Sequence, residues 1–452
     1  MRILLVDPPF QRFIGFYRFY FPLGVTYLAA MLKQAGHEVL IYDGELDADC
    51  SSPSMKDVAK NHHLYIEALR DDMNPIWSEY IKLLGDFEPQ IVGFSVLTTK
   101  LSSVVKMIKQ TKQYNSNIIV VAGGEHVTIR PHDVLNKQAD YVVCGEGEQG
   151  IVHLVQALSE GGCPQKVISR PLIEDLDTIP PPAIECLQKV KSYRPIDLGL
   201  MMSARGCPFS CSFCGLCVMW GHKVRYHSIS RIVQEMITRM DKYGTRYFSF
   251  RNGTFTIDRK WVIDFCQKLL DEKLNVGWEC LTRVDTIDDE LVQIMRKAGC
   301  NTIRLGIESG SEEVLRYMNK GISLAQIRNA ADILNRSGVF WSAYFMLGVP
   351  IETESSMRAT VELIKEIKPP FVTLAKFTPL PGTKMYQEVI NGNLLKEDDT
   401  DWTWAANQSL DQAFVKGMDP EKFLNMFHDI AQFVGEHNKE HILLRSDPRL
   451  KD

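Results

Sequence analysis

The stretch that decides the fold is Arg205-Gly-Cys-Pro-Phe-Ser-Cys-Ser-Phe-Cys-Gly-Leu-Cys217, which holds four cysteines within eleven residues. The first three, Cys207, Cys211 and Cys214, follow the spacing C-x3-C-x2-C, with Phe213 directly before the third. Three thiolates hold three irons of a [4Fe–4S] cluster and leave the fourth iron open to chelate a ligand. The spacing therefore predicts a cluster that takes part in chemistry, with Cys207, Cys211 and Cys214 as its ligands.

Two other interpretations of this loop stay open. Four cysteines also suit a tetrahedral zinc site. Zinc sites usually take two ligand pairs from separate segments, whereas these cysteines share one short loop, so the spacing favours the cluster. Cys211, Cys214 and Cys217 form a second grouping that is less in keeping with the spacing. In the favoured interpretation Cys217 is a spare thiol, packed beside the cluster or facing the active site.

The chain before this loop predicts a parallel sheet. Residues 1–160 alternate apolar runs with helical patterns. Strands are expected at 3–6, 38–42, 91–96, 117–122 and 141–144. Helices are expected at 22–35, 55–84, 101–114, 131–136 and 149–159. Unbroken apolar strands separated by helices indicate a parallel sheet covered on both faces, and so a doubly wound, Rossmann-like or flavodoxin-like α/β domain.

Ligands of such a domain bind at the carboxyl ends of the strands. Polar and small residues gather at these predicted ends: Ser95, Gly123, Gly124, Glu125, Gly145, Glu146 and Gly147. Glycine lets the backbone approach a ligand closely, but it also makes tight strand-to-helix turns. The local pattern leaves both explanations open.

A second α/β alternation follows a proline-rich linker at 161–192. Strands are expected at 198–203, 247–250, 277–281, 302–307, 340–347 and 372–377. Helices are expected at 230–243, 259–272, 288–298, 323–337 and 355–367. Six strand–helix steps over 193–390 predict a partial (β/α)6, TIM-like barrel with its active site at the strand carboxyl ends. The remainder, 391–452, is expected to be a small helical region with an amphipathic helix at 420–437.

Composition describes a globular protein of more than one domain. The chain has 452 residues, 45% of them hydrophobic and 24% charged, with a net charge of −5. That charge provides no broad positive field for nucleic acid, and no apolar run approaches the roughly 18 residues of a membrane span. Eleven cysteines, an odd and mostly scattered set, predict a reducing compartment. We therefore expect a cytoplasmic protein without a nucleic-acid or membrane partner.

The order of these motifs resembles that of cobalamin-binding-domain enzymes of the radical S-adenosylmethionine (SAM) superfamily. Asp7-Pro8-Pro9, Gly123-Gly-Glu-His126 and Cys144-Gly-Glu-Gly-Glu148 precede the proline-rich linker and the three cysteines, so the resemblance covers nearly the whole chain. It implies that the open iron binds SAM, that electron transfer cleaves SAM to a 5′-deoxyadenosyl radical, and that cobalamin lies across the strand carboxyl ends of the first domain. It also implies an external reductant, such as flavodoxin, ferredoxin or a dedicated reductase.

The resemblance further implies which residues position SAM. Arg304-Leu-Gly-Ile-Glu-Ser-Gly310 matches the segment beside adenine and ribose, which places Gly306, Glu308 and Ser309 there. Arg283 matches a position that pairs with the SAM carboxylate or with neighbouring acids. Phe213, and Pro350 in Gly348-Val-Pro350, match further SAM-side positions. For Glu308 a helix cap or an ion pair, and for Arg283 a structural ion pair, remain alternatives.

Two departures from the family pattern stand out. Related sequences often carry two acids before Thr-Phe, whereas Phe250-Arg-Asn-Gly-Thr-Phe255 has Asn252 and Gly253 there. The Asn252 carbonyl can accept a hydrogen bond from the SAM ammonium, but without a charge-assisted contribution. Proteins that place a histidine beneath cobalt carry Asp-x-His-x-x-Gly after the first strand, and no such motif occurs here. A bound cobalamin would lack that ligand, and a domain that has lost the cofactor is the alternative.

Methyl transfer to an unactivated carbon or phosphorus of a small organic substrate is the function that this resemblance implies most directly. The rival is a non-methylating dehydration, cyclisation or epimerisation with cobalamin absent or idle. A more distant alternative is a zinc-binding protein without catalysis. Cys217 and Cys280 are candidate hydrogen donors to a substrate radical, although buried packing is the more ordinary role for a cysteine.

Overall fold

The computed structural model describes residues 1–15, 20–46, 61–395, 402–405 and 412–442. The chain forms two compact units. The first unit comprises residues 1–198, 218–220 and 397–409. The second unit comprises residues 199–217, 221–396 and 410–452. The expected linker, 161–192, belongs to the first unit and contributes a strand to it.

The first unit is built on a six-stranded parallel sheet in the order β2-β1-β3-β4-β5-β6. Its strands are β1 (Arg2–Asp7), β2 (Glu38–Asp43), β3 (Ile91–Ser95), β4 (Ile119–Gly123), β5 (Tyr141–Cys144) and β6 (Val167–Ser169). Five were expected from the sequence. The sixth was missed because three residues inside a polar, proline-rich stretch carry almost no periodic signal.

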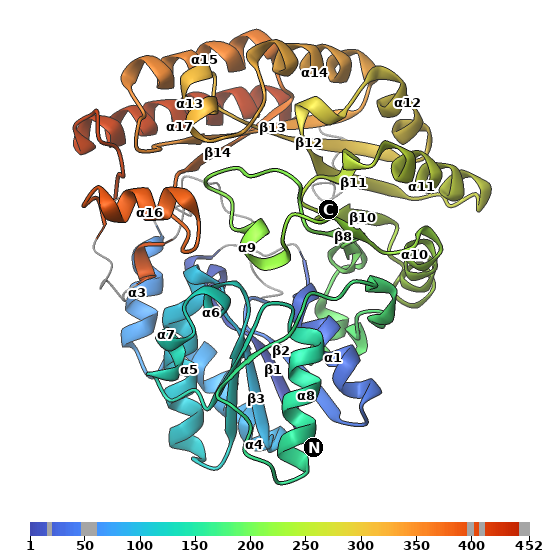
Figure 1. Ribbon diagram of the computed structural model, residues 1–452, viewed down its shortest axis with the longest axis vertical. Helices are drawn as coiled ribbons and strands as arrows, with labels where there is room; N and C mark the ends of the chain where they lie inside the picture. The colour runs from blue at the N-terminus through green and yellow to red at the C-terminus, as the bar shows by residue number, and fades with distance from the viewer. Residues whose placement is uncertain (16–19, 47–60, 396–401, 406–411, 443–452) are drawn as a thin grey trace. The chain divides into compact units, whose positions relative to one another are not determined.

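Helices lie on both faces of this sheet (Figure 1). On one face α1 (Leu23–Gln34) packs beside α8 (Gly147–Ser159). On the other, α5 (Leu101–Tyr114) lies beside α3 (His62–Arg70) and α4 (Pro75–Phe87). Two short helices, α6 (Glu125–Ile129) and α7 (His132–Leu135), follow β4. The Rossmann-like, doubly wound architecture expected from the sequence is confirmed.

The single helix expected at 55–84 is two helices over its described part, while residues 55–60 lie outside the described residues. The break comes at Asn74-Pro75. The Asn74 side chain accepts a hydrogen bond from the Ile76 amide at 3.1 Å, and Pro75 occupies the first helical position. This combination starts a new helix rather than continuing an old one.

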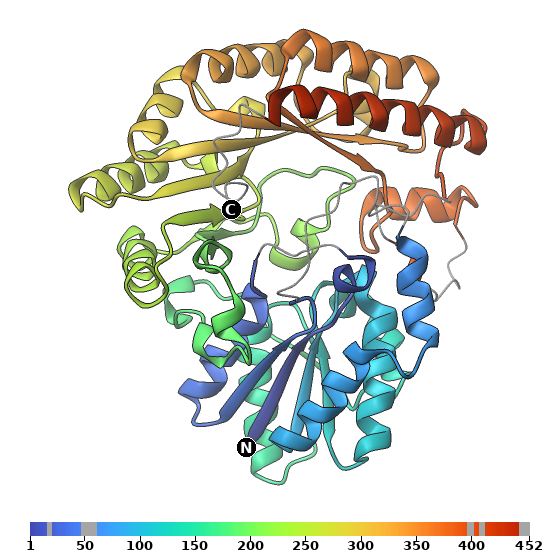
Figure 2. The same cartoon turned by 180° about the vertical axis from the view of Figure 1, so that it is seen from behind.

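The second unit contains the partial barrel. Its parallel sheet has the order β14-β13-β12-β11-β10-β7. The strands are β7 (Leu200–Met201), β10 (Tyr247–Phe250), β11 (Gly277–Thr282), β12 (Cys300–Glu308), β13 (Phe340–Leu347) and β14 (Phe371–Lys376). The main helices are α10 (Ile229–Tyr243), α11 (Arg259–Asp271), α12 (Asp289–Lys297), α13 (Glu312–Tyr317), α14 (Leu324–Ser337), α15 (Glu354–Ile367) and α16 (Lys384–Asn391). Figure 2 shows the same strands and helices from behind.

The two faces of the barrel sheet differ in polarity. Side chains on one face form a continuous apolar core with the helices, and Phe248, Trp278, Ile303 and Trp341 are each 0% exposed. Successive residues of a strand point to opposite faces, so the residues between these line the other, inner face. That inner face carries polar and charged side chains from β10, β11, β12 and β13.

The last described helix, α17 (Pro420–Ile442), covers the edge strand β14. The Asn438 amide substitutes for a neighbouring strand: its oxygen accepts from the Val372 amide at 2.8 Å, and its nitrogen donates to the Val372 carbonyl at 2.9 Å. The Val372 amide and carbonyl, which an exposed edge would leave for another chain, are therefore satisfied within the unit.

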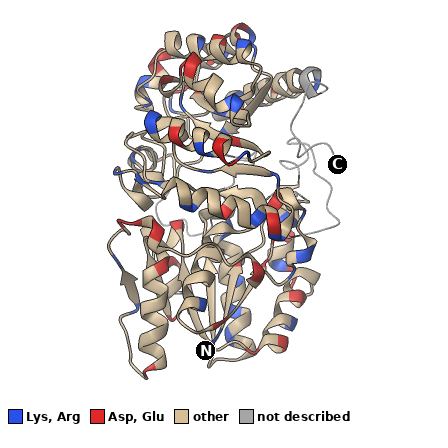
Figure 3. Cartoon of the chain, turned by 90° about the vertical axis from the view of Figure 1, so that its right-hand side faces the viewer, with Lys and Arg blue, Asp and Glu red and all other residues tan. Residues whose placement is uncertain are grey.

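The helix surfaces carry charges of both signs. Lys and Arg are interspersed with Asp and Glu in the view of Figure 3, and α11 holds the i,i+4 pairs Lys260–Asp264 and Lys268–Glu272. Such exposed pairs contribute little to stability. Within the described residues, every helix is too short or too polar to span a bilayer.

Candidate active site

Cys207, Cys211 and Cys214 lie on the loop between β8 (Ala204–Arg205) and α9 (Leu216–Trp220), and Cys217 lies in the first turn of α9. β8 pairs antiparallel with β9 (Arg225–Tyr226), which closes the loop at its base. This hairpin was not expected from the sequence, because two-residue strands leave no pattern. Asn252, which follows β10, accepts hydrogen bonds from the amides of Ser203 and Ala204 at 2.9 and 3.3 Å and donates to Ser203 Oγ at 2.7 Å.

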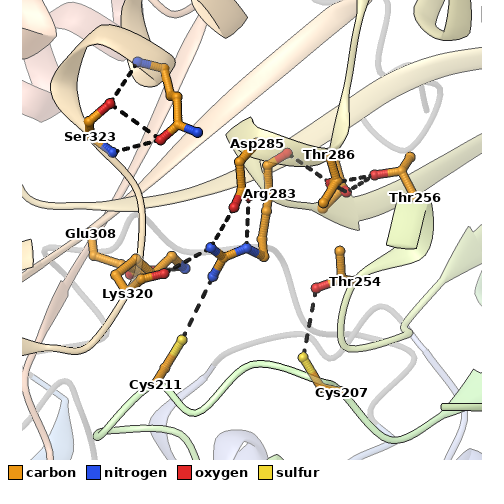
Figure 4. A network of polar contacts seen from close by, with 12 residues as sticks. Cys207, Cys211, Thr254, Thr256, Arg283, Asp285, Thr286, Glu308, Lys320 and Ser323 are labelled. Carbon is orange, nitrogen blue, oxygen red and sulfur yellow. Dashed lines mark hydrogen bonds and ion pairs between the residues drawn. The ribbon is translucent and has the colours of Figure 1, made fainter. Parts of the chain in front are cut away.

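The thiols of Cys207, Cys211 and Cys214 lie close enough to affect one another's charge. Burial raises the pKa of the Cys211 thiol, and the Lys320 and Arg283 cations act against that shift. Arg283 Nη1 lies 3.9 Å from Cys211 Sγ, and Thr254 Oγ1 lies 3.9 Å from Cys207 Sγ (Figure 4). Three soft ligands on one loop, with cations nearby to offset thiolate charge, suit an iron–sulfur cluster.

Arg283, directly after β11, is held from three directions. Its Nε and Nη2 each donate to Asp285 at 2.8 Å. Nη2 also donates to the Lys320 carbonyl at 2.8 Å, and the guanidinium lies 3.6 Å from the centroid of the Phe209 ring. This is the structural ion pair that the sequence left as an alternative, and it also fixes the guanidinium beside the cysteine loop.

Glu308 ends β12 and pairs with a lysine. Lys320 Nζ donates to Glu308 Oε1 at 2.7 Å. Glu308 has a φ of 73°, and the register shifts here between β12 and β13. A Cβ at Gly306 would lie 2.7 Å from Glu308 Oε1 and 2.9 Å from Lys320 Nζ. Glycine at 306 therefore leaves the space that this ion pair occupies.

Cys217 differs from the other three cysteines because its sulfur faces backbone carbonyls. Its Sγ donates to the carbonyls of Phe209 at 3.2 Å and Cys207 at 3.4 Å. Burial, together with the neighbouring cysteines, raises the pKa of this thiol to about 11. A protonated thiol that already donates to the loop is a poor iron ligand.

The remaining predicted SAM residues are spread around the second unit. Ser309 is fully buried, with its Oγ 3.4 Å from Thr360 Oγ1 of α15. Pro350 accepts a hydrogen bond from the Lys416 amide at 2.8 Å. Phe213 lies on the cysteine loop, with its ring centroid 5.8 Å from Lys320 Nζ.

Cys280 requires a correction. It is 0% exposed and belongs to the apolar core on the helix-covered face of the sheet. Because side chains alternate along a strand, Cys280 points away from the inner face that its neighbours Glu279 and Leu281 line. Its role is packing, and it is not placed to act as a hydrogen donor.

Lys320 is the site residue that sequence analysis missed. It follows α13 in Met318-Asn-Lys-Gly321 and is only 6% exposed. A lysine in a short turn gives no periodic signal. Its partner Glu308 lies twelve positions away, at the register shift between β12 and β13.

In the first unit, a buried ion cluster joins the carboxyl ends of β1, β2 and β3. Lys100 Nζ lies 2.8 Å from Asp7 Oδ1 and 2.9 Å from Glu45 Oε1, and all three side chains are at most 5% exposed. Glu45 Oε2 also accepts from the Phe10 and Arg12 amides at 3.0 Å each. The cluster therefore fixes the loop after β1, which lies at the switch point where such domains bind ligands.

The glycines at the strand ends divide into two kinds. Gly124 has a φ of 109°, and a Cβ there would lie 2.9 Å from the Val96 carbonyl oxygen. A Cβ at Gly123 would lie 3.2 Å from the Val143 oxygen and one at Gly147 3.1 Å from Leu28, so these three serve internal packing. Gly145 has a φ of 77° and no atom within 4 Å of an added Cβ. Only Gly145 leaves open space at the sheet end.

The predicted polar residues at these ends have mixed roles. Glu146 is buried and accepts from the Ile173 amide at 2.6 Å, which is a structural contact. Burial raises the pKa of the Glu125 carboxyl, and Ser95 is half-buried beside Gly123. Leu97, two residues beyond Ser95, is 42% exposed. An exposed apolar side chain and open backbone at a strand end suit a large planar cofactor.

His126 lies at this end of the sheet and is fully buried. Its Nδ1 lies 3.1 Å from Thr98 Oγ1 and its Nε2 lies 3.1 Å from Asp133 Oδ2. Its ring packs edge-on against Trp402 at 5.2 Å between centroids. Both ring nitrogens already have partners, so His126 is not arranged as an axial metal ligand.

Two sequence-family models match separate parts of the chain. The B12 binding domain matches residues 16–155, and the radical SAM superfamily matches residues 201–364. The two matches fall on the doubly wound sheet of the first unit and on the barrel of the second.

Characterised and uncharacterised proteins resemble the chain over most of its length. It is 32% identical to an uncharacterised methyltransferase of Pyrococcus horikoshii, over 87% of this chain and 84% of that protein. It is 28% identical to the anaerobic magnesium-protoporphyrin IX monomethyl ester cyclase of Rubrivivax gelatinosus, over 81% of this chain and 66% of the cyclase.

Solved structures share the fold. The radical S-adenosylmethionine methyltransferase TsrM of Kitasatospora setae, with cobalamin and a [4Fe–4S] cluster bound, aligns with a TM-score of 0.67 at 17% identity. The alignment covers 86% of this chain and 75% of TsrM. The cobalamin-dependent radical enzyme OxsB aligns with a TM-score of 0.72 at 14% identity, over 96% of this chain and 66% of OxsB.

Proposed function

We propose that this chain, which belongs to the radical SAM superfamily and carries a B12-binding domain, methylates an unactivated carbon or phosphorus of a small organic substrate. Its cofactors are a [4Fe–4S] cluster, SAM and cobalamin. The observation that carries the proposal is the loop of three thiols beside Arg283 and Lys320. The 32% identity to an uncharacterised methyltransferase over most of both chains supports the methyl-transfer assignment.

Cys207, Cys211 and Cys214 hold the cluster in this proposal. When bound, the cluster supplies the electron that cleaves SAM to a 5′-deoxyadenosyl radical, which abstracts hydrogen from the substrate. Cys217 and Asn252 position the loop, since the first donates to its carbonyls and the second accepts from the amides that precede it. An external electron donor, such as flavodoxin, ferredoxin or a dedicated reductase, completes the system.

Arg283, Glu308 and Lys320 bind the polar groups of SAM. Arg283 and Lys320 present cations for the SAM carboxylate, and Glu308 presents an anion for its ammonium. Gly306 keeps space for the Glu308–Lys320 pair, while Phe213, Ser309 and Pro350 shape the surrounding surface. A charged contact of this kind is directional and short, which places SAM in one orientation.

Ser95, Leu97, Glu125 and Gly145, at the carboxyl ends of the first unit's sheet, would hold cobalamin. When bound, the cofactor would supply a methyl group that SAM donates. The Asp7–Lys100–Glu45 cluster positions the loop after β1 on which this surface depends. The motif Asp-x-His-x-x-Gly does not occur in that loop. Both ring nitrogens of His126 already have hydrogen-bond partners.

The second candidate is a radical reaction without methyl transfer. It is favoured by the 28% identity to a cyclase and by Asn252 in place of an acid. The deciding experiment is anaerobic reconstitution with iron, sulfide and cobalamin, followed by mass analysis of products from methyl-deuterated SAM. Methyl transfer yields S-adenosylhomocysteine with 5′-deoxyadenosine, and the label enters the product.

Formation of 5′-deoxyadenosine and product without S-adenosylhomocysteine would instead establish the second candidate. Iron and sulfide analysis of the same preparation tests the zinc alternative, because a zinc site would hold no inorganic sulfide. Omitting cobalamin from a parallel reconstitution is the control: a methyl transfer that depends on it ceases, whereas SAM cleavage by the cluster continues.

A further inference from the structure

The segment Asn252-Gly-Thr254, which follows β10, meets the cysteine loop at successive positions. The Asn252 side chain accepts hydrogen bonds from backbone amides directly ahead of the loop. A Cβ at Gly253 would lie 3.2 Å from Cys207 Cβ and 2.9 Å from Leu216 Cδ1. A side chain at 253 would therefore press against the loop, and glycine lets the two segments pass closely.

This close passage brings the Thr254 hydroxyl to a cysteine sulfur. Thr254 Oγ1 lies 3.9 Å from Cys207 Sγ, and the threonine is only 5% exposed (Figure 4). Within the part of the chain that the structure describes, this sulfur is the one hydrogen-bond partner of the hydroxyl. A thiolate bound to iron has lone pairs and no proton, so in the loaded protein the hydroxyl is the donor.

The three proposed ligand sulfurs have three different hydrogen-bond donors. Arg283 Nη1 lies 3.9 Å from Cys211 Sγ, and the Leu216 backbone forms a hydrogen bond to Cys214. Arg283 already belongs to the proposed SAM site, and a backbone amide is not removed by substitution. Thr254 is the donor whose hydroxyl the SAM site does not explain.

Hydrogen bonds to its sulfurs help to set the reduction potential of an iron–sulfur cluster. They stabilise the reduced state more than the oxidised state, because the reduced cluster carries one more negative charge. Burial strengthens this effect, since little water is present to screen the charge. A donor to a cysteine ligand therefore raises the potential, and its loss lowers it.

The geometry points to Thr254 as a residue that sets the reduction potential of the cluster, acting through the sulfur of Cys207. This inference rests on the proposed function, since it takes Cys207 as an iron ligand. One electron passes from the external donor to the cluster in this step, and the threonine proton stays on its oxygen. The hydroxyl makes the cluster easier for that donor to reduce.

The test is a redox titration of the reconstituted cluster without SAM, followed by paramagnetic resonance of the reduced state. Thr254→Val keeps the size of the side chain and removes the hydroxyl. At a fixed potential we expect its ratio of reduced to oxidised cluster to be about tenfold lower, which is about 59 mV for a one-electron couple. Thr254→Ser keeps a hydroxyl, so its midpoint should lie close to that of wild type.

Thr302→Val is the matched control. Thr302 is also buried, but it lies near the start of β12, and its hydroxyl contacts Tyr247 and Asn301 rather than a sulfur. Its loss should leave the midpoint unchanged. Thr254→Val should also cleave SAM at the wild-type rate with titanium(III) citrate, a strong reductant, and more slowly with flavodoxin.

Equal midpoints for wild type and Thr254→Val, or an equal shift in Thr254→Ser or Thr302→Val, would overturn the inference. Slow cleavage of SAM by Thr254→Val with both reductants would overturn it too, because the residue would then act on more than the potential. Thr254→Ala is the second variant, and loss of the cluster from both it and Thr254→Val would reduce Thr254 to a structural role. Failure of the proposed function is distinguishable, since wild-type protein would then hold no cluster to titrate.

Discussion

At the scale of single residues, chemically identical side chains have different surroundings. Cys217 donates to two loop carbonyls, whereas Cys211 lies beside Arg283 and Lys320. The four cysteines are therefore not equivalent, although they lie within eleven positions of sequence. A sulfur near cations, such as that of Cys211, is suited to bind iron as a thiolate. The Cys217 sulfur, which donates to carbonyls, is suited to remain a protonated thiol.

Alanine substitution separates these roles. Cys207→Ala, Cys211→Ala and Cys214→Ala should each abolish the visible absorption of the reconstituted cluster and 5′-deoxyadenosine formation, because the cluster loses an essential ligand. Cys217→Ala should retain both and bind close to four irons. Loss of iron from Cys217→Ala with iron retained in Cys207→Ala would reverse the ligand assignment.

Glu352 gives the second unit a pH-dependent stability. It is 0% exposed, accepts from the Gly348 amide at 3.1 Å and bonds to Ser356 Oγ. Burial raises its pKa from 4.5 to about 7. Between these values the unfolded chain loses the proton and the folded one keeps it, so stability falls as the pH rises from about 4.5 to about 7 and then levels off.

Glu352→Gln should remove this pH dependence. The amide cannot ionise, so wild-type protein should lose about 3 kcal/mol of stability relative to the variant between pH 4.5 and pH 7.5. Denaturant unfolding of both proteins at each pH, followed by the fluorescence of the second unit, measures the difference. A constant gap between the two proteins across this range would show that Glu352 does not titrate as described.

At the scale of elements, side chains complete what strands leave open. The edge strand β14 would expose the amide and carbonyl of Val372, and Asn438 of α17 bonds to both. The helix is thus attached to the sheet by polar contacts as well as by apolar packing through Phe423, Ile430 and Val434.

Asn438→Ala should destabilise the second unit by about 1–3 kcal/mol, since two partly buried backbone groups lose their partners. Asn438→Asp is the graded comparison: it keeps the acceptor for the Val372 amide and loses the donor for the carbonyl. We expect its thermal midpoint between those of wild type and Asn438→Ala. An unchanged midpoint in both would mean that water replaces the side chain without cost.

Gly124 and Gly145 provide a matched pair in the first unit. Both have positive φ, but a Cβ at Gly124 meets the Val96 backbone at 2.9 Å and one at Gly145 meets nothing. Gly124→Ala should lower stability and corrinoid retention together. Gly145→Ala should cost only about 1–2 kcal/mol of backbone strain, so any further loss of corrinoid, measured by absorbance after desalting, reports on the cofactor surface itself.

At the scale of the whole molecule, the B12-binding and radical SAM family matches fall on two different compact units, and we propose that each unit binds its cofactor independently. Cys214→Ala protein should therefore lose its cluster and still retain close to one equivalent of corrinoid after desalting. Lys100→Met, which removes the cation from between two buried carboxylates, should lose corrinoid and keep the cluster. Loss of both cofactors from each variant would show that the units do not load independently.

The corrinoid in this molecule should have no histidine beneath its cobalt. The chain lacks Asp-x-His-x-x-Gly, and both nitrogens of His126 have partners in Thr98 and Asp133. Paramagnetic resonance of the reduced, cobalt(II) form should show no nitrogen splitting from an imidazole. Such splitting, retained in His126→Gln protein, would identify another histidine as the ligand.

Sequence by itself determined the architecture and the spacing of the cysteines that we propose as cluster ligands. Apolar runs at strand length alternating with amphipathic helices allow few arrangements other than parallel sheets, and both predicted sheets are present. The C-x3-C-x2-C spacing is local, so the chain alone specifies it. Errors fell on short elements, such as β6 and β8, whose two or three residues carry no period, and on the helix break at Asn74-Pro75.

Only the tertiary structure decided the partners of the charged residues. Lys320 meets Glu308 across twelve positions at the register shift between β12 and β13. Arg304 meets Glu279 across twenty-five positions because their strands are neighbours in the sheet. The face of the sheet on which Cys280 lies also depends on the tertiary structure, because it is set by how β11 is oriented in the sheet. Periodicity specifies which face is buried, but the pairing of side chains from distant strands depends on register and bulges, which the sequence of one strand does not contain.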